Sequence, residues 1–494
     1  MNAPSCMALG FARGVLRRLP GTVAVVVLAA VAGALAAAFA QPAEGAQASV
    51  ELGLGGNLVA GAWNPLQVTV RDAGPCVLRL RIDEGTLMTG PRIVRYTAAV
   101  PGGSGVTVFD DDVYVPRFQT LSWTLSETDR VLASGSLGAR DADARPLQVV
   151  VSAAPGVWRD AFAADARFVD VAASQLPARA AAYDGVATLL LDGTAAAPQT
   201  ASIAAAAAGG AQVLLAGTLP ASQAGLGRLA GAGADRLGAG EVRIVADDPA
   251  AVEAALRSWR KPDRSALVTA LTSAPLVKAP RSAPQPLVLS LAAAYALIAL
   301  LALRFAGTPG AAAAVALALI VSLAGWRLLR PPAAVVAGDR TVMLGGGELA
   351  LALGVEERIT LPAGTVSVRG AARPLTPALY SVDAAGTHVA LERWQGVVLA
   401  SRSWLRPASL RFEGGKLLNA GSTAFQNVYV VGLGSQPALQ SGASLTPAPG
   451  EEGARPPEMA RLAAVLPRGT ALAEGPEAVW VALPPLASAA GGAR

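Results

Sequence analysis

The side chains that could support nucleophilic catalysis are few in this chain. It has one histidine, His388, and two cysteines, Cys6 and Cys76. Nucleophilic catalysis needs a nucleophile within hydrogen-bond reach of a base. His388 stands in the alternating run Thr387-His388-Val389-Ala390-Leu391, which is typical of a strand, so a dyad with Cys76 would have to form between two β-rich regions. We therefore expect an exposed strand histidine, and the sequence predicts no catalytic residue and no cofactor.

Acidic residues offer a second kind of chemistry. The densest group is Asp110, Asp111 and Asp112, and adjacent carboxylates can hold a calcium ion. An acid run at a strand edge is more often solvated, so no metal site is predicted. Asp184 and Asp192 are the positions that an enzymatic site without Cys or His would use.

Phosphate-binding and hydrolase motifs are absent from the sequence. The run Gly414-Gly415-Lys416-Leu417 has the lysine of a phosphate-binding loop but neither its spacing nor its hydroxyl residue. No Gly-x-Ser-x-Gly elbow occurs. These absences give no support to nucleotide hydrolysis or to a serine-hydrolase elbow.

Tryptophans could form a sugar-binding face. Trp63 and Trp123 lie in the first β-rich region, and Trp394, Trp404 and Trp480 follow in the last part of the chain. Buried tryptophans are commoner than exposed ones in β-domains, so we expect Trp394, Trp404 and Trp480 to be core residues. Trp63 and Trp123 are the positions at which an accessory subunit of a polysaccharide-export complex would bind glycan.

Two apolar runs past the middle of the chain could position the rest at a membrane. Residues 287–303 and 311–326 contain no charged residue, and a helix of this length reaches roughly 25 Å, close to the hydrocarbon thickness of a bilayer. With only residues 304–310 between them, they predict a transmembrane helical hairpin. The bilayer is then a partner of this chain, and the regions before and after the hairpin share a compartment.

The first 40 residues predict which compartment that is. Arg13, Arg17 and Arg18 precede an apolar run that ends at Ala38-Phe39-Ala40, the pattern of a signal peptide or an uncleaved signal anchor. Most basic residues that flank the apolar pair would then lie outside, against the positive-inside tendency, but long domains follow an export signal largely regardless of charge. We expect an inner-membrane protein with large domains on the extracytoplasmic side.

Composition excludes several classes of partner and bond. The chain has 494 residues, 15% of them charged, and a net charge of +5 without a basic stripe interleaved with aromatics, so nucleic acid is not expected. Removal of the first 40 residues would leave Cys76 alone. A disulfide within the mature chain is therefore excluded.

The pattern of short runs divides the chain into regions. Residues 49–140 alternate like the strands of an immunoglobulin-like β-sandwich, with Leu66, Val68 and Val70 on one face. Residues 145–260 alternate strands, among them 147–151 and 186–191, with helices, among them 178–183, and predict a flavodoxin-like parallel sheet. A linker at 261–286 leads to the apolar pair, residues 331–445 return to a β-rich pattern, and 446–494 form a linker and C-terminal segment. The predicted fold class is a multidomain α/β plus all-β protein with transmembrane helices.

The second region carries a family resemblance. Leu176-Pro177, Tyr183-Asp184, the run Leu189-Leu190-Leu191-Asp192-Gly193 and the run from Gly209 to Gly217 together resemble the class I glutamine-amidotransferase-like domain of bacterial membrane-anchored envelope proteins. Enzymes of that family need a nucleophilic cysteine and a histidine. This region has neither, so the resemblance implies a degenerate, non-catalytic domain.

The expected function follows from these absences. The sequence favours a non-catalytic, membrane-anchored cell-envelope protein that binds or scaffolds other envelope or membrane proteins through exported domains. One alternative is an accessory subunit of a polysaccharide or other export complex, because the order of domains is similar to that of the periplasmic regulatory subunit of cellulose synthase. The other alternative is an enzyme with an unrecognised site in the amidotransferase-like domain.

Overall fold

The computed structural model of the chain is built mainly of β-strands. It describes residues 47–486 except 85–92, 129, 142, 194–198, 218–233, 259–263, 274–275, 277–296, 298–299, 302–303, 305–334, 361–362, 377, 393–394 and 450–455. The strands of the described residues form five sheets. The α-helices whose full bounds lie within the described residues are nine or ten residues long: α3 (Thr200–Ala208), α5 (Pro249–Ser258), α6 (Arg264–Thr272) and α8 (Pro457–Val465).

The first region packs two sheets face to face. A three-stranded sheet in the order β1-β2-β5 faces a larger sheet that contains β3, β4, β6 and β7. Side chains alternate between the two faces of a strand, so one face of β2 packs into the core. Its residues Leu66, Val68 and Val70 are almost fully buried. The strands are β1 (Gln47–Leu52), β2 (Ala62–Ala73), β3 (Cys76–Asp83), β4 (Ile93–Val100), β5 (Gly103–Val115), β6 (Thr120–Glu127) and β7 (Arg130–Gly138).

The larger sheet of this region continues into strands from much later in the chain. β4 pairs in parallel with β18 (Leu379–Asp383), followed by β19 (Gly386–Leu391) and β16 (Gly364–Val368), so the sheet has seven strands in the order β16-β19-β18-β4-β3-β6-β7. One hydrophobic cluster contains both Leu121 and Leu399. Two stretches that are far apart in sequence therefore share one sheet and one core.

The second region is a six-stranded layer in the order β12-β13-β11-β10-β8-β9. Helix α3 packs on one face, while α5 and the 3₁₀ helix η2 (Pro155–Ala161) pack on the other. All neighbouring pairs are parallel except β12 with β13. The strands are β8 (Leu147–Val151), β9 (Arg167–Asp170), β10 (Val186–Asp192), β11 (Gln212–Ala216), β12 (Ala234–Leu237) and β13 (Gly240–Val245).

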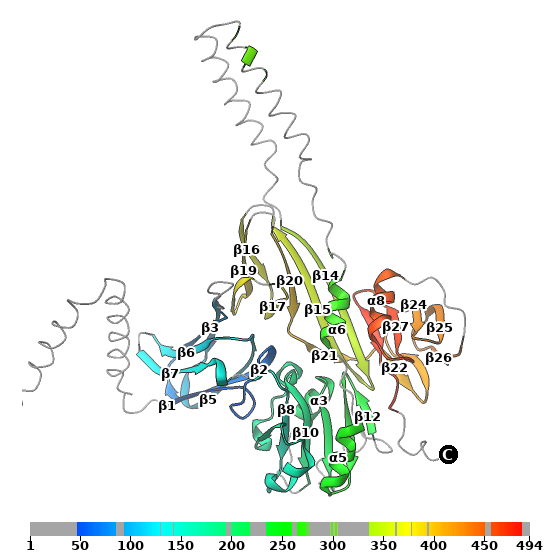
Figure 1. Cartoon of the computed structure of the whole chain (residues 1–494), viewed down its shortest axis with the longest axis horizontal. Coiled ribbons are helices and arrows are strands. Elements are labelled where there is room, and N and C mark those ends of the chain that lie inside the picture. The colour runs from blue at the N-terminus through cyan, green and yellow to red at the C-terminus, as the bar shows by residue number, and fades with distance from the viewer. Residues whose placement is uncertain are drawn as a thin grey trace, which may run out of the picture.

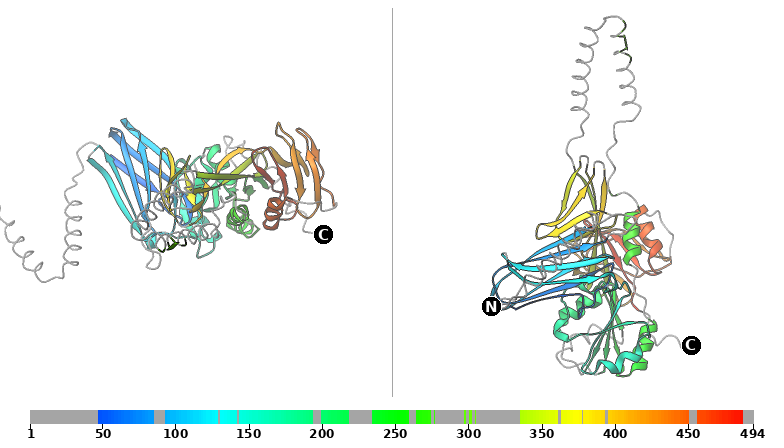
Figure 2. Two further views of the ribbon diagram at one scale, coloured as in Figure 1. Left: turned by 90° about the horizontal axis from the view of Figure 1, so that it is seen from above. Right: turned by 60° about the vertical axis from the view of Figure 1, so that its left-hand side comes forward.

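The last region is built on a long hairpin of two twelve-residue strands, β14 and β15. In Figure 1 the first region lies on one side of this hairpin and the C-terminal strands lie on the other, while the six-stranded layer lies below it. Helices α6 and α8 share a core cluster beside it, and Figure 2 shows them lying together. The strands are β14 (Val335–Gly346), β15 (Leu349–Thr360), β17 (Ala372–Pro374), β20 (Gly396–Ser401), β21 (Trp404–Pro407), β22 (Leu410–Glu413), β23 (Lys416–Asn419), β24 (Phe425–Val430), β25 (Gly434–Leu439), β26 (Ser444–Leu445), β27 (Ala471–Glu474) and β28 (Val479–Ala482).

The predicted fold class is wrong. The chain is not a flavodoxin-like parallel sheet joined to transmembrane helices and separate β-domains, because strands dominate and the six-stranded layer is mixed and sparsely helical. Residues 178–183, expected to be an α-helix, contain only the 3₁₀ helix η4 (Ala180–Tyr183). Alanine favours a helix locally, but this segment follows Pro177 and its residues Ala180 to Tyr183 are buried against neighbouring elements, and tertiary packing overrides propensity.

The prediction of transmembrane helices is corrected as well. Among the residues that the structure describes, no helix combines the length and the apolar character that crossing a bilayer requires. The two predicted spans, 287–303 and 311–326, lie outside the described residues apart from Leu297, Leu300 and Leu301. The predicted export signal at 1–40 lies outside them too. The prediction rested on the hydropathy of these runs in an Ala-rich chain, and hydropathy alone does not show how a segment packs.

Candidate functional site

The acid run Asp110 to Asp112 lies on β5, next to β2. Its residues pair with Gln67, Leu66 and Pro65 of that strand. Asp110 and Asp112 stand two residues apart on β5 and so lie on the same face of the strand. Asp112 is nevertheless buried, while Asp110 is exposed. The run was expected to be a solvated strand edge, yet each of its residues contacts another part of the molecule.

Asp112 is fully buried and faces two arginines. Arg179 Nε lies 3.0 Å from Asp112 Oδ2, and Arg402 Nη1 lies 3.7 Å from the same oxygen. The other oxygen, Oδ1, is buried and has no hydrogen-bond partner among the described residues. Burial raises the pKa of the Asp112 carboxyl above its usual value, against the opposing effect of Arg179 and Arg402.

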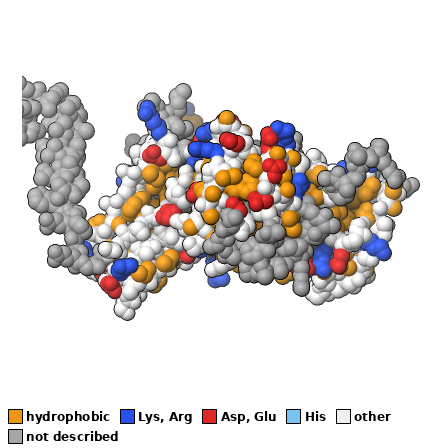
Figure 3. Space-filling model, turned by 90° about the horizontal axis from the view of Figure 1, so that it is seen from below, with side chains coloured by type: hydrophobic (Ala, Val, Ile, Leu, Met, Phe, Trp, Pro, Cys, Tyr) orange, Lys and Arg blue, Asp and Glu red, His pale blue; other side chains and the backbone are white. Residues whose placement is uncertain are grey.

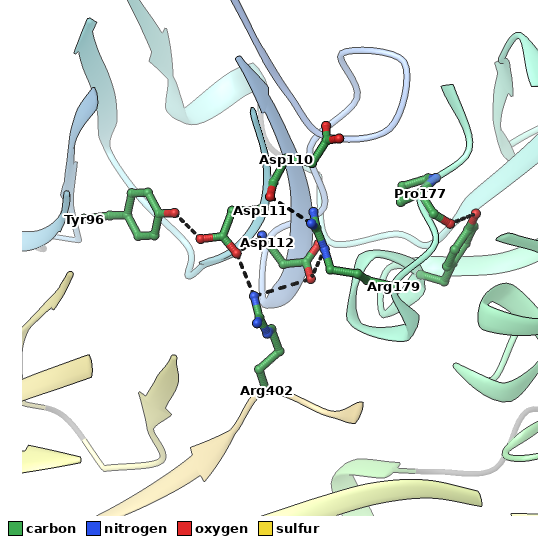
Figure 4. Close-up of polar contacts among 8 residues, drawn as sticks. Tyr96, Asp110, Asp111, Asp112, Pro177, Arg179 and Arg402 are labelled. Atoms are coloured by element: carbon green, nitrogen blue, oxygen red, sulfur yellow. Dashed lines mark hydrogen bonds and ion pairs between the residues drawn. The ribbon is translucent and has the colours of Figure 1, made fainter. Parts of the chain in front are cut away.

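Asp111 and Asp110 extend these contacts (Figure 4). Arg402 Nη1 donates to Asp111 Oδ1 at 2.7 Å, while the Tyr96 hydroxyl donates to Asp111 Oδ2. Arg179 Nη1 donates to the backbone carbonyl of Asp110 at 2.8 Å. Burial and the neighbouring Asp111 carboxylate raise the pKa of the Tyr96 phenol, so Tyr96 remains a donor at neutral pH.

These contacts join three regions of the chain. Tyr96 and the three aspartates come from the first region, Arg179 comes from the segment just before η4, and Arg402 lies between β20 and β21. We call this cluster the acid joint. The carboxylates are engaged by guanidinium groups, and within the described residues no group of three or more His, Cys, Asp or Glu could hold a metal ion. The geometry thus gives the calcium hypothesis no support.

A second set of contacts reinforces the acid joint. Arg373 of β17 donates to the Tyr114 hydroxyl at 2.9 Å and lies over the Tyr114 ring, 4.6 Å from its centroid. The ring of Trp63 meets Tyr114 edge-on, with 5.7 Å between centroids. The Trp63 backbone N–H donates to Asp184 Oδ2 at 3.1 Å. Asp184, a candidate in an enzymatic site, is thus part of an interface between regions, beside a small cavity of about 150 Å³.

Asp192 lies at the end of β10, next to the end of β8. It accepts hydrogen bonds from Ser152 Oγ at 2.5 Å and from Trp158 Nε1 at 3.1 Å. The carboxyl ends of parallel strands are where α/β layers commonly bind ligands. Here the Asp192 carboxylate connects two strand ends and the η2 segment, which is a structural use of this group.

His388 bonds two neighbours on the surface of its sheet. Ser367 Oγ of β16 lies 2.8 Å from His388 Nδ1, and His388 Nε2 lies 3.0 Å from Asp383 Oδ1. Asp383 also accepts from the backbone N–H groups of Ala385 and Gly386 in the turn that follows it. Because an ionised carboxylate only accepts, the proton of the neutral ring belongs on Nε2 and the Nδ1 lone pair faces Ser367. This trio of residues was not anticipated from the sequence, because it depends on strand pairing.

The cysteine–histidine dyad does not form. Cys76 of β3 and His388 of β19 share one sheet but are separated by β18 and β4, which at a strand spacing of about 4.8 Å puts them at least roughly 14 Å apart. The strand register adds to this distance, because His388 is in line with Arg81 of β3 and not with Cys76. Cys76 is buried, and burial raises the pKa of its thiol. A buried thiol with a raised pKa is a poor nucleophile.

Replacing His388 with alanine is expected to raise the pKa of Asp383. The hydrogen bond from His388 is the main cause of the lowered pKa of this carboxyl, with the Ala385 N–H as the second. Carbon-13 NMR titration of the side-chain carboxyls measures the change. Arg130→Ala, at a distant ion pair with Glu127, is the matched control and should leave the Asp383 titration unchanged.

The tryptophans do not form a sugar-binding platform in the described residues. Trp63 is buried, Trp123 is partly buried, and Trp480 is partly buried against Phe425. Trp404 is exposed on β21, and Trp394 lies outside the described residues. The expectation of core positions agrees with the packing of Trp480 and is wrong for Trp404.

Comparison with known proteins does not assign this chain to a family. No protein-family model matches the chain, and no curated protein shows significant similarity to it.

Two residues of the acid joint, Arg179 and Arg402, were not predicted from the sequence. The only local signal for Arg179 is a lone charge in the apolar segment Leu176-Pro177-Ala178-Arg179-Ala180-Ala181.

Proposed function

We propose that this chain is a non-catalytic cell-envelope protein that binds or scaffolds other envelope components through exported domains. The acid joint is the observation that carries this proposal. A fully buried carboxylate between two arginines from other regions fixes how these regions sit against each other. A binding or scaffolding protein needs such a fixed arrangement, because partners then meet a preformed surface.

The chemistry of the polar groups supports the non-catalytic part of the proposal. Asp112, Asp184 and Asp192 all make structural contacts, and Cys76 is buried away from His388. The resemblance of residues 176–217 to a degenerate amidotransferase-like domain fits a binding module that lacks the family's Cys and His. On the face in Figure 3, acidic and basic side chains are interspersed, which agrees with a protein partner better than with nucleic acid.

Location on the extracytoplasmic side of the inner membrane is part of the same proposal. Its support is the basic, apolar and small-residue pattern of residues 1–40. A reporter enzyme that works only after export, fused to the C-terminus of the whole chain, tests it. Activity of a cytoplasm-only reporter at that position contradicts it.

The binding proposal predicts that partner capture depends on the acid joint. Crosslinking in intact cells, followed by purification, should recover the same discrete partner with the wild-type chain and with Arg257→Ala, an exposed ion-pair variant. Arg402→Ala loosens the joint and is expected to lower recovery at least about fivefold. Thermal unfolding of each purified variant shows whether the chain remains folded. Equal recovery from a folded Arg402→Ala variant contradicts the role of the joint.

An enzymatic site outside the amidotransferase-like region has one direct test. A serine with a base and an oriented carboxylate is the arrangement that activates nucleophiles, and Ser367, His388 and Asp383 have these residue types. A fluorophosphonate probe is expected to leave Ser367 unlabelled, since the site lies on an open sheet surface at the edge strand β16. Labelling of Ser367 that disappears in His388→Gln would overturn the non-catalytic proposal.

A further inference from the structure

A cleft of about 250 Å³ opens beside the acid joint, between the first region and the six-stranded layer. Strands β1, β2 and β5 contribute Glu51, Gln67 and Asp110 to one wall. The other wall carries Gln175 of the 3₁₀ helix η3 (Ala173–Gln175), Arg179, and Gln199, which precedes α3. We call the space lined by these six polar residues the amide cleft. The acid joint holds its two walls together through Arg179.

Several polar groups of the amide cleft lack a protein partner. Glu51 and Gln199 make no side-chain hydrogen bond to any described residue, and Gln199 does not cap α3 although it stands at its N-terminus. Gln67 uses its amide nitrogen on Asp110 Oδ1 at 3.1 Å, which leaves its carbonyl oxygen. Gln175 uses its carbonyl oxygen to accept from the Ala172 N–H, which leaves its amide nitrogen. The cleft therefore offers both donors and acceptors.

The charges of the cleft disfavour an anion, because Glu51 and Asp110 repel it and Arg179 is already paired with Asp112. A cation such as an ammonium group cannot accept a hydrogen bond, so it would leave the amide N–H groups of Gln175 and Gln199 unused. A hydroxyl group both donates and accepts, so it satisfies such a mixed set without adding a charge. Leu54, Pro65, Leu176 and Pro177 supply an apolar part of the lining against which C–H groups can pack.

We propose that the amide cleft binds a neutral, hydroxyl-rich ligand, namely a short segment of a saccharide. Its volume of about 250 Å³ lies below the range of ligand pockets, which measure roughly 300–1,000 Å³, so it holds only a short segment of a longer chain. Without an aromatic platform in the lining, the affinity is weak, with a Kd on the order of 1 mM. The saccharide site adds a ligand to the proposed scaffold function. It is a separate proposal, because it rests on the amide cleft and not on partner capture through the acid joint.

Saturation-transfer difference NMR on the whole chain tests the proposal. The probes are cellotetraose, maltotetraose and chitotetraose, with tetralysine and tetraglutamate as charged comparisons. At least one saccharide is expected to bind. Gln199→Ala and Glu51→Ala should each weaken its binding about fivefold to tenfold, the effect of one lost hydrogen bond. Glu477→Ala, an exposed glutamate far along the chain, is the matched control and should bind like the wild type.

Three outcomes overturn the proposal. One is the absence of any saccharide signal at probe concentrations on the order of 10 mM. Another is tetralysine or tetraglutamate binding while the saccharides do not, which would assign the cleft to a charged peptide. A third is saccharide binding that Gln199→Ala and Glu51→Ala leave unchanged while both variants unfold like the wild type. None of these results bears on partner capture through the acid joint, so the scaffold proposal is tested separately.

Discussion

Replacing Arg179 with alanine is expected to lower the free energy of unfolding by about 3 kcal/mol at neutral pH, because it leaves a buried carboxylate without its nearest cation. Arg179 Nε lies 3.0 Å from Asp112 Oδ2, and the Asp112 side chain has no exposed surface. Arg402 stays 3.7 Å away and compensates only part of the loss. Denaturant unfolding of the purified chain measures the change.

The same variant is expected to be more stable in mild acid than at neutral pH. Burial already raises the pKa of Asp112 in the folded chain, and loss of Arg179 raises it further. Between the unfolded value near 3.9 and this raised value, the folded chain binds a proton that the unfolded chain does not. Stability therefore falls as the pH rises through that interval, and the effect of Arg179→Ala should be larger at about pH 8 than at about pH 5.

Two further variants make this prediction specific. Arg257→Ala breaks an ion pair whose side chains are 76% and 46% exposed, so it should change stability by at most about 0.5 kcal/mol. Adding Asp112→Asn to Arg179→Ala removes the unpaired charge and should restore part of the lost stability. A pH-independent effect of Arg179→Ala, or one as small as that of Arg257→Ala, would show that the joint does not stabilise the chain.

Local patterns predicted many individual strands of this fold. The runs 147–151 and 186–191 were expected as strands and are β8 and β10. Alternating burial in Leu66, Val68 and Val70 was expected as well. These signals are local, because the period of side chains along a strand follows from one short segment.

Partners across the chain could not be predicted in this way. The pairing of β4 with β18 depends on which strand edges meet after folding. The sequence of residues 93–100 contains no signal that identifies β18, which begins only at Leu379, as the neighbouring strand. The acid joint failed to emerge from the sequence for the same reason. Asp112 was visible as an acidic residue, but its burial and its contact with Arg179 arise only when the regions pack. The predicted division into regions carried no information on the contacts between them, so it did not include this interface.

The shared core predicts a second large effect, on a part of the chain remote from the substitution. Leu399 of β20 is almost fully buried in the cluster that also holds Leu78 and Leu80 of β3. Leu399→Ala removes methyl groups and leaves a cavity, and is expected to cost about 3 kcal/mol of unfolding free energy. If the core is shared, the loss should be felt by β3 and β4 as faster amide exchange, because local opening follows the stability of the cooperative unit.

Hydrogen exchange followed by mass spectrometry separates this shared core from two independent ones. Peptides that cover residues 76–83 and 93–100 should exchange faster in Leu399→Ala than in the wild type. Leu417→Ala is the matched control, because Leu417 is equally buried but belongs to the cluster around Phe425. It should speed exchange around β23 and leave β3 and β4 as they are. If Leu399→Ala speeds amide exchange only in residues after 331, the first region has its own core, and β16, β18 and β19 do not share it.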